Sequence, residues 1–314
     1  MNPATDPEIQ ALFGADKVEI YQSPAPVGEW PILAWCRAMG DENPVYRDRD
    51  AARSHGHEDV FAPPVMMYSF TMPGLFAETR HSLLSTLRRR LAEHGFDCVL
   101  AGNFEQEFVT PVRLGDRLSR TARFESMSAE KRTSVGAGYF VVLADEIVNQ
   151  DGAVVGRQKM QTLFFRPGQI DAKRESAQTR KAPEPRAAST ARVELPPLRI
   201  SVTSTLIIAA ALATNDYEPV HHDRDLARSQ GLSDIIMNVL TSSGLAIRYV
   251  TDWAGPATLV RRISTQLKAP AYPGETLTLS GWIDESLEPG SAKQVHVRAT
   301  NSLGTHIDSI ITIS

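Results

Sequence analysis

The sequence predicts an α+β fold that is built twice along one chain. A segment beginning at residue 41 returns at residue 216, and each copy is followed by a long helical segment and then by about four segments with strand periodicity. Between the copies, residues 166–198 are poor in large apolar side chains and rich in Pro, Ala, Lys and Arg, which is typical of a linker. We therefore expect an N-terminal domain over 1–165, a linker over 166–198 and a C-terminal domain over 199–314.

The duplication depends on identities at a constant spacing. "DENPVYRDRDAARSHGHED" (41–59) matches "DYEPVHHDRDLARSQGLSD" (216–234) at an offset of 175, and both keep the proline, the Asp-Arg-Asp run and the glycine. A second pair, "TPVRLGD" (110–116) and "APAYPGE" (269–275), is offset by only 159. The first half therefore carries additional residues between its two motifs, in the region 73–97.

Each half begins with an apolar helical segment, 30–40 or 204–214, that leads into the acidic turn. Asp48 and Asp223 follow the turns and are expected to cap short helices, because an Asp opens each segment and a Gly closes it. A longer helix comes next, over 238–255 in the second half. In the first half the corresponding helix is predicted over 65–92, with an interruption at Pro73-Gly74.

After these helices the pattern changes to a period of two, with β-branched and aromatic residues bounded by Gly, Pro and Asp. The predicted strands are 103–112, 116–128, 134–149 and 154–165 in the first half, and 257–270, 275–287, 293–304 and 306–314 in the second. One long helix followed by antiparallel strands predicts a sheet wrapped around the helix, and the two sheets are expected to pair within the chain.

Composition limits the classes of function. Hydrophobic residues make up 42% and charged residues 22%, which is typical of a globular protein, and a net charge of −4 without a basic stripe argues against nucleic-acid binding. Cys36 and Cys98 are far apart, which excludes a disulfide framework and a zinc ribbon and favours a reducing compartment. The N-terminus lacks the apolar core of a signal peptide, and no apolar run reaches the roughly 18 residues of a membrane helix. We expect a cytoplasmic protein with no membrane span.

The two turns carry a family motif. "MGDENPVYRDRD" and "NDYEPVHHDRD", each followed by a long helix and by a segment such as "PVRLGD", resemble the Gly-Asp-x-Asn-Pro-x-His-x-Asp signature of the MaoC-like hotdog hydratases and dehydratases. The first copy departs from the motif at the histidine, where Tyr46 stands. The second copy keeps Asp216 and His221 but has Asn215 at the Gly position and Glu218 at the Asn position.

This resemblance implies two tandem hotdog folds that form a single-chain pseudo-dimer. The second half, with "NVLTSSGLAIRYVTDWAGP", resembles the small subunit of the two-subunit enoyl-CoA hydratases of bacterial steroid side-chain degradation. The first half resembles the degenerate hotdog of the larger subunit. The implied activity is hydration of a 2-enoyl-CoA to a 3-hydroxyacyl-CoA in the degradation of a steroid (sterol or bile acid) side chain. CoA is then part of the substrate and no separate cofactor is implied. The zinc-binding extension by which the larger subunit docks an aldolase has no counterpart in this sequence.

The chemistry of hydration points to residues in the second half. Addition of water to an enoyl thioester needs a base for the water and an acid for the α-carbon, and a carboxylate with an imidazole can supply both near neutral pH. We assign Asp216 and His221 to this catalytic pair. By resemblance, backbone N–H groups at Asn238 and Val239 would bind the thioester oxygen at the start of the long helix.

The first half lacks this pair, because a tyrosine with a pKa of about 10 cannot replace the imidazole as a base. We expect a catalytically silent lobe that helps to bind substrate through residues at the corresponding positions: Asp41, Asn43, Tyr46, Pro63 and Pro64. No metal site is expected, since the adjacent His221 and His222 lack a third ligand at a suitable spacing. His306 lies in a strand pattern and is expected to be a structural or surface residue.

Other functions fit the same fold. An acyl-CoA thioesterase is one, and a non-catalytic acyl-CoA-binding scaffold for a thiolase or an aldolase is another, because fold alone does not select a function. Without the duplication, Asp216 and His221 would be interpreted as a polar turn next to a helix. The Asp-His turn ahead of the helix favours hydration. A homodimer is a further hypothesis.

Overall fold

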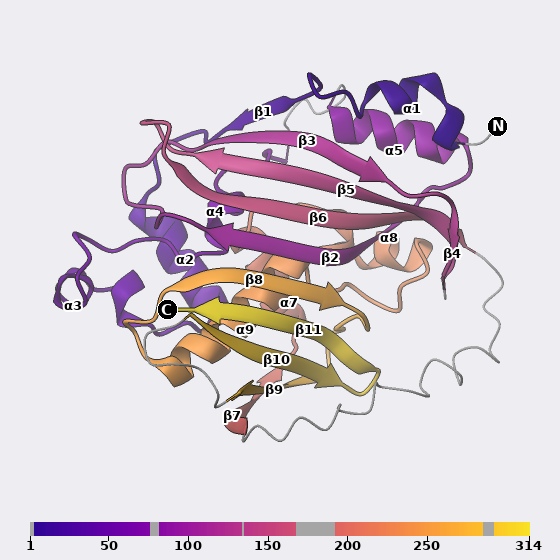
Figure 1. The fold of residues 1–314 in the computed structure, drawn as a ribbon. Coiled ribbons are helices and arrows are strands. Elements are labelled where there is room, and N and C mark those ends of the chain that lie inside the picture. The colour runs from indigo at the N-terminus through magenta and orange to yellow at the C-terminus, as the bar shows by residue number, and fades with distance from the viewer. Residues whose placement is uncertain (1–2, 76–81, 134, 168–191, 285–291) are drawn as a thin grey trace.

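The computed structural model describes residues 3–75, 82–133, 135–167, 192–284 and 292–314. Their strands form one continuous antiparallel sheet, with α2, α7 and α9 behind it in the view of Figure 1. The sheet order is β1-β3-β5-β6-β2-β8-β11-β10-β9-β7, with β4 paired to β5. We call the described residues up to 167 the first lobe and those from 192 onward the second lobe.

The first lobe supplies β1 (Glu19–Gln22), β2 (Cys98–Phe108), β3 (Ser119–Met127), β4 (Lys131–Arg132), β5 (Gly136–Val148) and β6 (Val154–Pro167). The second lobe supplies β7 (Arg192–Ser201), β8 (Val260–Leu267), β9 (Thr276–Asp284), β10 (Lys293–Asn301) and β11 (Gly304–Ile313). Residues 103–107 of β2 pair with 262–266 of β8. The two sheets therefore join through a strand pair within one chain, as the sequence predicts.

The helices around the two turns repeat at the predicted offset. The first lobe has α2 (Glu29–Met39), the 3-10 turn η2 (Pro44–Tyr46) and α3 (Arg49–Ser54), and the second has α7 (Ser204–Ala213), η3 (Pro219–His221) and α8 (Arg224–Ser229). Asp48 accepts a hydrogen bond from the amide of Ala51, and Asp223 from those of Asp225 and Leu226. Both predicted helix caps are confirmed.

The lobes differ in the long helix. In the second lobe α9 (Val239–Ala254) is continuous, as predicted. In the first lobe the expected helix over 65–92 is replaced by the short α4 (Met66–Ser69) and by α5 (Leu83–Glu93), with residues 76–81 outside the described part. Pro73 disfavours a helical backbone at the residue before it and supplies no amide hydrogen, so the break is larger than an interruption at two residues.

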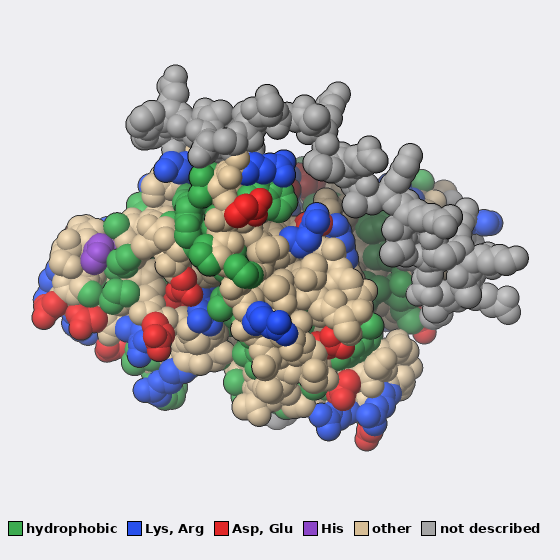
Figure 2. All heavy atoms as spheres, turned by 90° about the horizontal axis from the view of Figure 1, so that it is seen from below, with side chains coloured by type: hydrophobic (Ala, Val, Ile, Leu, Met, Phe, Trp, Pro, Cys, Tyr) green, Lys and Arg blue, Asp and Glu red, His purple; other side chains and the backbone are tan. Residues whose placement is uncertain are grey.

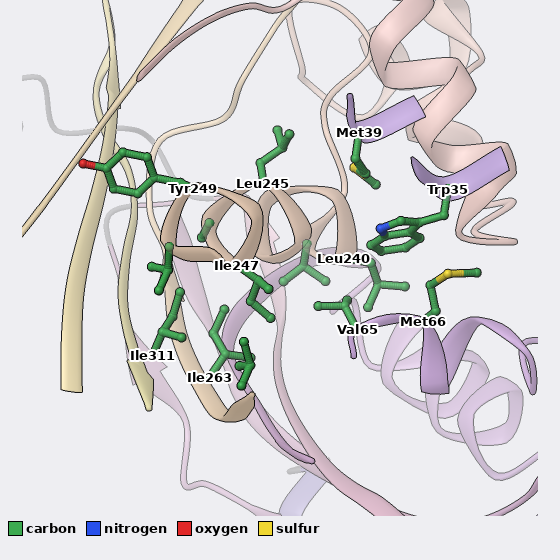
Figure 3. Packing of buried hydrophobic residues seen from close by; sticks show 14 of the residues in the cluster. Trp35, Met39, Val65, Met66, Leu240, Leu245, Ile247, Tyr249, Ile263 and Ile311 are labelled. Carbon is green, nitrogen blue, oxygen red and sulfur yellow. The ribbon is translucent and has the colours of Figure 1, made fainter. Parts of the chain in front are cut away.

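α5 packs with α1 (Pro7–Ala11) at one end of the first lobe, where Leu87 and Leu91 join Ile9 and Phe124 in a cluster separate from the main core. The main core spans both lobes. Figure 3 shows Trp35 and Met39 of α2 beside Leu240 of α9.

This contact between helices of different lobes depends on a glycine. A Cβ at Gly244 of α9 would lie 2.7 Å from the Trp35 ring, which is too close for any side chain. The two lobes are therefore joined by shared packing as well as by the β2–β8 pair.

Strands occupy both ends of the predicted linker, because β6 extends to Pro167. β7 takes in residues 192–198, which the sequence analysis placed in the linker, and 168–191 lie outside the described residues. Pro196 and Pro197 fall where the register of β7 against β9 shifts between Leu195 and Leu198. An edge strand tolerates prolines at such a bulge, so a proline-rich segment can still pair.

In the described ranges, no helix is long and apolar enough to cross a membrane. On the face drawn in Figure 2, acidic and basic side chains are interspersed.

Candidate active site

The turn that carries the predicted catalytic pair, residues 215–221, follows directly on α7, and we call it the catalytic turn. Asn215 has a left-handed backbone, with φ 53°, and the amide of Asp216 donates to the carbonyl of Ala211 at 2.9 Å, which closes the end of the helix. Pro219 then opens the 3-10 turn that ends at His221. One Asp216 carboxylate oxygen accepts from the amide of Glu218 at 3.3 Å, so local bonds orient the carboxylate.

The structure brings the two predicted catalytic side chains together. His221 Nε2 lies 3.5 Å from Asp216 Oδ2, and the side chains are only 10% and 13% exposed. His221 Nδ1 lies 2.7 Å from the carbonyl oxygen of Ile236. A carbonyl only accepts, so Nδ1 carries the hydrogen, and in the neutral ring Nε2 presents its lone pair toward the carboxylate. Two acceptors at this distance suit a water molecule that donates to both.

The start of α9 adjoins this pair. Asn238 caps the helix, because its Oδ1 accepts from the amide of Thr241 at 2.7 Å. Its Nδ2 donates to Thr214 Oγ1 at 2.9 Å, next to the catalytic turn. Val239 is the first residue of α9, and the amides of a first helical turn have no partner within the helix. The predicted oxyanion residues therefore lie at the start of α9. Ile236, whose carbonyl bonds to His221, stands two residues before Asn238.

The corresponding turn of the first lobe has a different chemistry. Asp41 accepts from the amide of Asn43 at 3.0 Å, and Asn43 caps η2 through the amide of Val45 at 3.2 Å. Tyr46 takes the place of His221 and packs edge-on against Phe61, with ring centroids 5.2 Å apart. Burial raises the pKa of the Asp41 carboxyl and that of the Tyr46 hydroxyl, so this turn offers no imidazole and no readily ionised hydroxyl.

Pro63 and Pro64 fall where Asn238 and Val239 stand in the second lobe. Proline has no N–H, so the amide donors of that position are missing. A mainly apolar cavity of about 40 Å³ lies here, and Tyr46 and Pro64 line it, whereas Asp41, Asn43 and Pro63 do not. The cavity also touches residues 258–261, which follow the far end of α9, so it is distant from the Asp216–His221 pair.

Cross-lobe contacts at the catalytic turn escaped the sequence analysis. Asn215 Nδ2 donates to the carbonyl of Ser69 in α4 at 3.1 Å, and Arg88 of α5 forms an ion pair with Glu218 at 2.6 Å. Asn215 and Glu218 are the two positions where this turn departs from the family motif. Those departures were a visible signal, although nothing in the sequence identified the partners in the first lobe.

His222 is exposed, next to the helix cap Asp223. In the part of the chain that the structure describes, no group of three or more His, Cys, Asp or Glu side chains is arranged to hold a metal ion.

His306 is a buried structural residue. Its Nδ1 lies 2.7 Å from the carbonyl of Ala269, and its Nε2 lies 2.8 Å from the Ser242 hydroxyl in the second turn of α9. The Ala269 carbonyl requires a hydrogen on Nδ1, so Nε2 of the neutral ring is an acceptor that faces the Ser242 hydroxyl, and this hydroxyl also lies 3.0 Å from the carbonyl of Asn238. Burial lowers the pKa of His306. The neutral ring therefore ties α9 to the loop after β8.

We expect stability to fall with acidification through this residue. The pKa of His306 in the folded state lies below the unfolded value of about 6.5, so the unfolded chain binds more protons and stability is lost as pH falls through that value. Urea midpoints of the wild type and of His306→Gln, measured from roughly pH 8 to pH 5, test this linkage. The wild type should lose stability more steeply than the variant, and parallel curves would contradict the assignment.

Two family models match the chain, one over each lobe. A family model for a FAS1-like dehydratase domain region matches residues 17–158, and one for a MaoC-like domain matches residues 187–306. The chain is 43% identical over 120 residues to the beta subunit of 3-oxo-4,17-pregnadiene-20-carboxyl-CoA hydratase of Mycobacterium tuberculosis, covering 38% of this chain and 92% of the relative.

Two alpha subunits are also similar. A probable enoyl-CoA hydratase alpha subunit of Thermomonospora curvata is 38% identical over 184 residues, covering 57% of each chain. The alpha subunit of the Mycobacterium tuberculosis pregnadiene-carboxyl-CoA hydratase is 33% identical over 144 residues, covering 45% of this chain and 46% of the relative. The chain thus spans about half the length of each alpha subunit.

Solved structures share the fold across the whole chain. A MaoC-like dehydratase superposes with a TM-score of 0.74 at 21% identity, covering 97% of this chain and 98% of the other. A Mycobacterium tuberculosis protein described as a double hotdog superposes with a TM-score of 0.62 at 13% identity, covering 94% and 95%. With this fold, and with a 43% identical relative covered over 92% of its length, the chain belongs to the MaoC-like dehydratase family and has the double hotdog fold.

Proposed function

We propose that this protein is an enoyl-CoA hydratase that adds water across a 2-enoyl-CoA to give a 3-hydroxyacyl-CoA. The observation that carries the proposal is the Asp216–His221 pair, with two acceptor atoms 3.5 Å apart and the other ring nitrogen committed to the Ile236 carbonyl. Two relatives are named as a 3-oxo-4,17-pregnadiene-20-carboxyl-CoA hydratase beta subunit and a probable enoyl-CoA hydratase alpha subunit, and these names support the same reaction class.

In the proposed mechanism a water molecule donates one hydrogen to the Asp216 carboxylate and the other to His221 Nε2. As the water oxygen bonds to the β-carbon, one proton passes to this pair and the electrons of the double bond move onto the thioester oxygen. The backbone amides of Asn238 and Val239, at the start of α9, stabilise that enolate oxygen. The pair then returns a proton to the α-carbon, so that one water is consumed and one 3-hydroxyacyl thioester is formed.

We place one active site on each chain. The first-lobe turn has Tyr46 in place of the histidine, and Pro63 and Pro64 supply no amide donors. We expect that adding Tyr46→His to a His221→Ala variant does not restore turnover, because the oxyanion donors are still missing. Steady-state hydration by the double variant measures this, with the thermal transition confirming that it folds. Recovery of turnover would mean that the first lobe can catalyse.

We propose a bulky acyl group, such as the side chain of a steroid with its rings, as the substrate. In the first lobe α4 and α5 are separate, so no continuous helix like α9 fills its sheet. Leu143 and Met160 pair across β5 and β6 and are only half-buried, with Leu143 packed against the α5 cluster and Met160 against the main core. A polycyclic group could cover them. The pregnadiene-carboxyl-CoA substrate in the relatives' names supports this size.

The reaction class is tested by incubating the protein with an enoyl-CoA and recording two signals. Loss of the conjugated enoyl absorbance without release of free thiol supports hydration. Release of free thiol would instead show an acyl-CoA thioesterase. Binding without either signal, for every enoyl-CoA tried, would favour the scaffold for a thiolase or aldolase.

Substrate size is tested by comparing crotonyl-CoA, a medium-chain enoyl-CoA and a steroidal enoyl-CoA. We expect the largest kcat/KM for the steroidal substrate, by at least about tenfold, since a well-filled apolar site yields about 1.4 kcal/mol from a few buried methylenes. Similar values for all three would count against a dedicated steroid enzyme.

Assembly and location also belong to the proposal. Relatives are named as alpha and beta subunits, and here two lobes lie in one chain. A homodimer, an aldolase or thiolase partner and a cytoplasmic location are our working hypotheses. Light scattering of the purified chain tests the first of them.

A further inference from the structure

Asn215 has an unusual backbone for its residue type. Among the described residues other than glycine, it alone has a positive φ, at 53°. The corresponding residue of the first lobe is Gly40, with a φ of 61°. Asn tolerates this left-handed region better than most residues, but Gly adopts it without strain. The Asn side chain must therefore offer something that a glycine cannot.

That side chain makes a cross-lobe hydrogen bond next to the catalytic carboxylate. Asn215 Nδ2 donates to the carbonyl of Ser69 at 3.1 Å. Ser69 ends α4 in the first lobe and is only 1% exposed. The bond thus fixes the residue directly before Asp216 to a buried point of the other lobe.

The corresponding turn of the first lobe, residues 40–46, is here called the silent turn. It is also held by a cross-lobe hydrogen bond, but there the side chain comes from the other lobe. Arg248 of α9 donates from Nη1 to the carbonyl of Met39 at 2.7 Å, and a Cβ at Gly40 would lie 2.9 Å from that guanidinium nitrogen. The glycine therefore leaves room for an arginine from the other lobe. Each turn is held by a side chain that reaches a carbonyl across the lobe boundary, but at the catalytic turn the side chain belongs to the turn itself.

The first-lobe end of the bond is well anchored. Arg120 donates from Nε to Thr71 Oγ1 at 3.1 Å and from Nη2 to the Thr71 carbonyl at 3.4 Å, two residues after Ser69. Its Nη1 pairs with Asp145 at 2.8 Å, and the two side chains are 3% and 0% exposed. The Arg120 guanidinium also lies over the Tyr68 ring, 4.6 Å from its centroid. A buried ion pair thus holds the loop that receives the Asn215 amide.

We propose that Asn215 is a positioning residue, which holds Asp216 at the distance from His221 that a shared water requires by tying the catalytic turn to Ser69. The inference rests on the proposed hydration. A hydration water has to contact both acceptors at once, so a small movement of the turn separates them and lowers the rate of the chemical step. Substrate binding, which involves other surfaces, changes little.

Two substitutions remove the bond, and the first of them adds no charge. Asn215→Gly keeps the backbone conformation without strain, and Asn215→Asp keeps the size but cannot donate through its side chain. For both we expect kcat to fall about tenfold, as the loss of one hydrogen bond of about 1.4 kcal/mol would give, with KM within about twofold. Arg248→Met is the matched control, since it removes the corresponding bond at the silent turn. It should leave kcat unchanged.

Hydrogen exchange gives a readout that does not need turnover. Amides of residues 216–218 and 220–222 should exchange faster in Asn215→Gly than in the wild type, and those of the silent turn should not. Faster exchange in a protein that hydrates no enoyl-CoA would support the tie while refuting the proposed function. If Asn215→Gly had the same kcat and the same amide exchange rates as the wild type, the inference would be overturned. An equal loss of kcat in Arg248→Met would overturn it too, because general loosening of the lobes would then explain the effect.

Discussion

His221→Ala and Asp216→Asn should each lower kcat by about 10²- to 10⁴-fold, with little change in KM. Each substitution removes one of the two acceptors that face each other at 3.5 Å, so the water loses one of its two contacts and the proton its receiver. The two residues act on one water, so the double variant should be hardly worse than the poorer single variant. Initial rates of enoyl absorbance loss measure all three proteins.

The neighbouring histidine provides the control for this prediction. His222 follows His221 in the chain but is exposed and makes no described contact with Asp216. His222→Ala should keep the wild-type kcat. If His221→Ala retained activity within about threefold of the wild type, the catalytic assignment would be wrong, whatever the fold.

Arg120→Met should destabilise the protein by about 3–5 kcal/mol, because it leaves the Asp145 carboxylate buried without its partner. The two groups lie 2.8 Å apart with almost no exposed surface, and Gln158 adds a bond to Asp145 at 3.4 Å. The double variant Arg120→Met/Asp145→Leu should recover most of this loss, since it removes both charges. Urea unfolding of the three proteins gives the free energies.

An exposed ion pair of similar length is the matched control. Lys159 and Glu125 lie 2.6 Å apart, with side chains 52% and 39% exposed. Lys159→Met should change stability by no more than about 1 kcal/mol. Equal losses for Arg120→Met and Lys159→Met would show that burial of the Arg120–Asp145 pair does not matter as argued.

The sequence predicted the parts of the fold that depend on local pattern. α7 follows a continuous apolar segment, and α9 follows apolar periodicity. The caps Asp48 and Asp223 were predictable because aspartate side chains readily accept hydrogen bonds from the free amides at a helix start. β7 was missed because its prolines indicate a linker, and only pairing with β9 makes a bulged edge strand favourable. The division into α4 and α5 was underestimated because a proline marks where a helix ends but not where the next begins.

In the candidate site, too, the local contacts could be predicted from the sequence and the contacts between lobes could not. The Asp216–His221 spacing lies within one turn, so the sequence could predict that both side chains meet. The partner of Asn215 lies 146 residues away at Ser69, in a segment without a matching motif. Contacts of that kind depend on how two lobes pack, and the departures from the family motif at Asn215 and Glu218 are their local signs.

The pairing of β2 with β8 has a consequence for how the two halves of such a protein can be encoded. Separated, either half would expose the strand edge that 103–107 and 262–266 now pair, beside apolar helix surface, and exposed edges of this kind promote aggregation. An organism that encodes the halves as two genes must therefore match their synthesis. Fusion into one polypeptide removes that demand, because every chain that contains the second lobe also contains the first lobe, whose β2 pairs with β8.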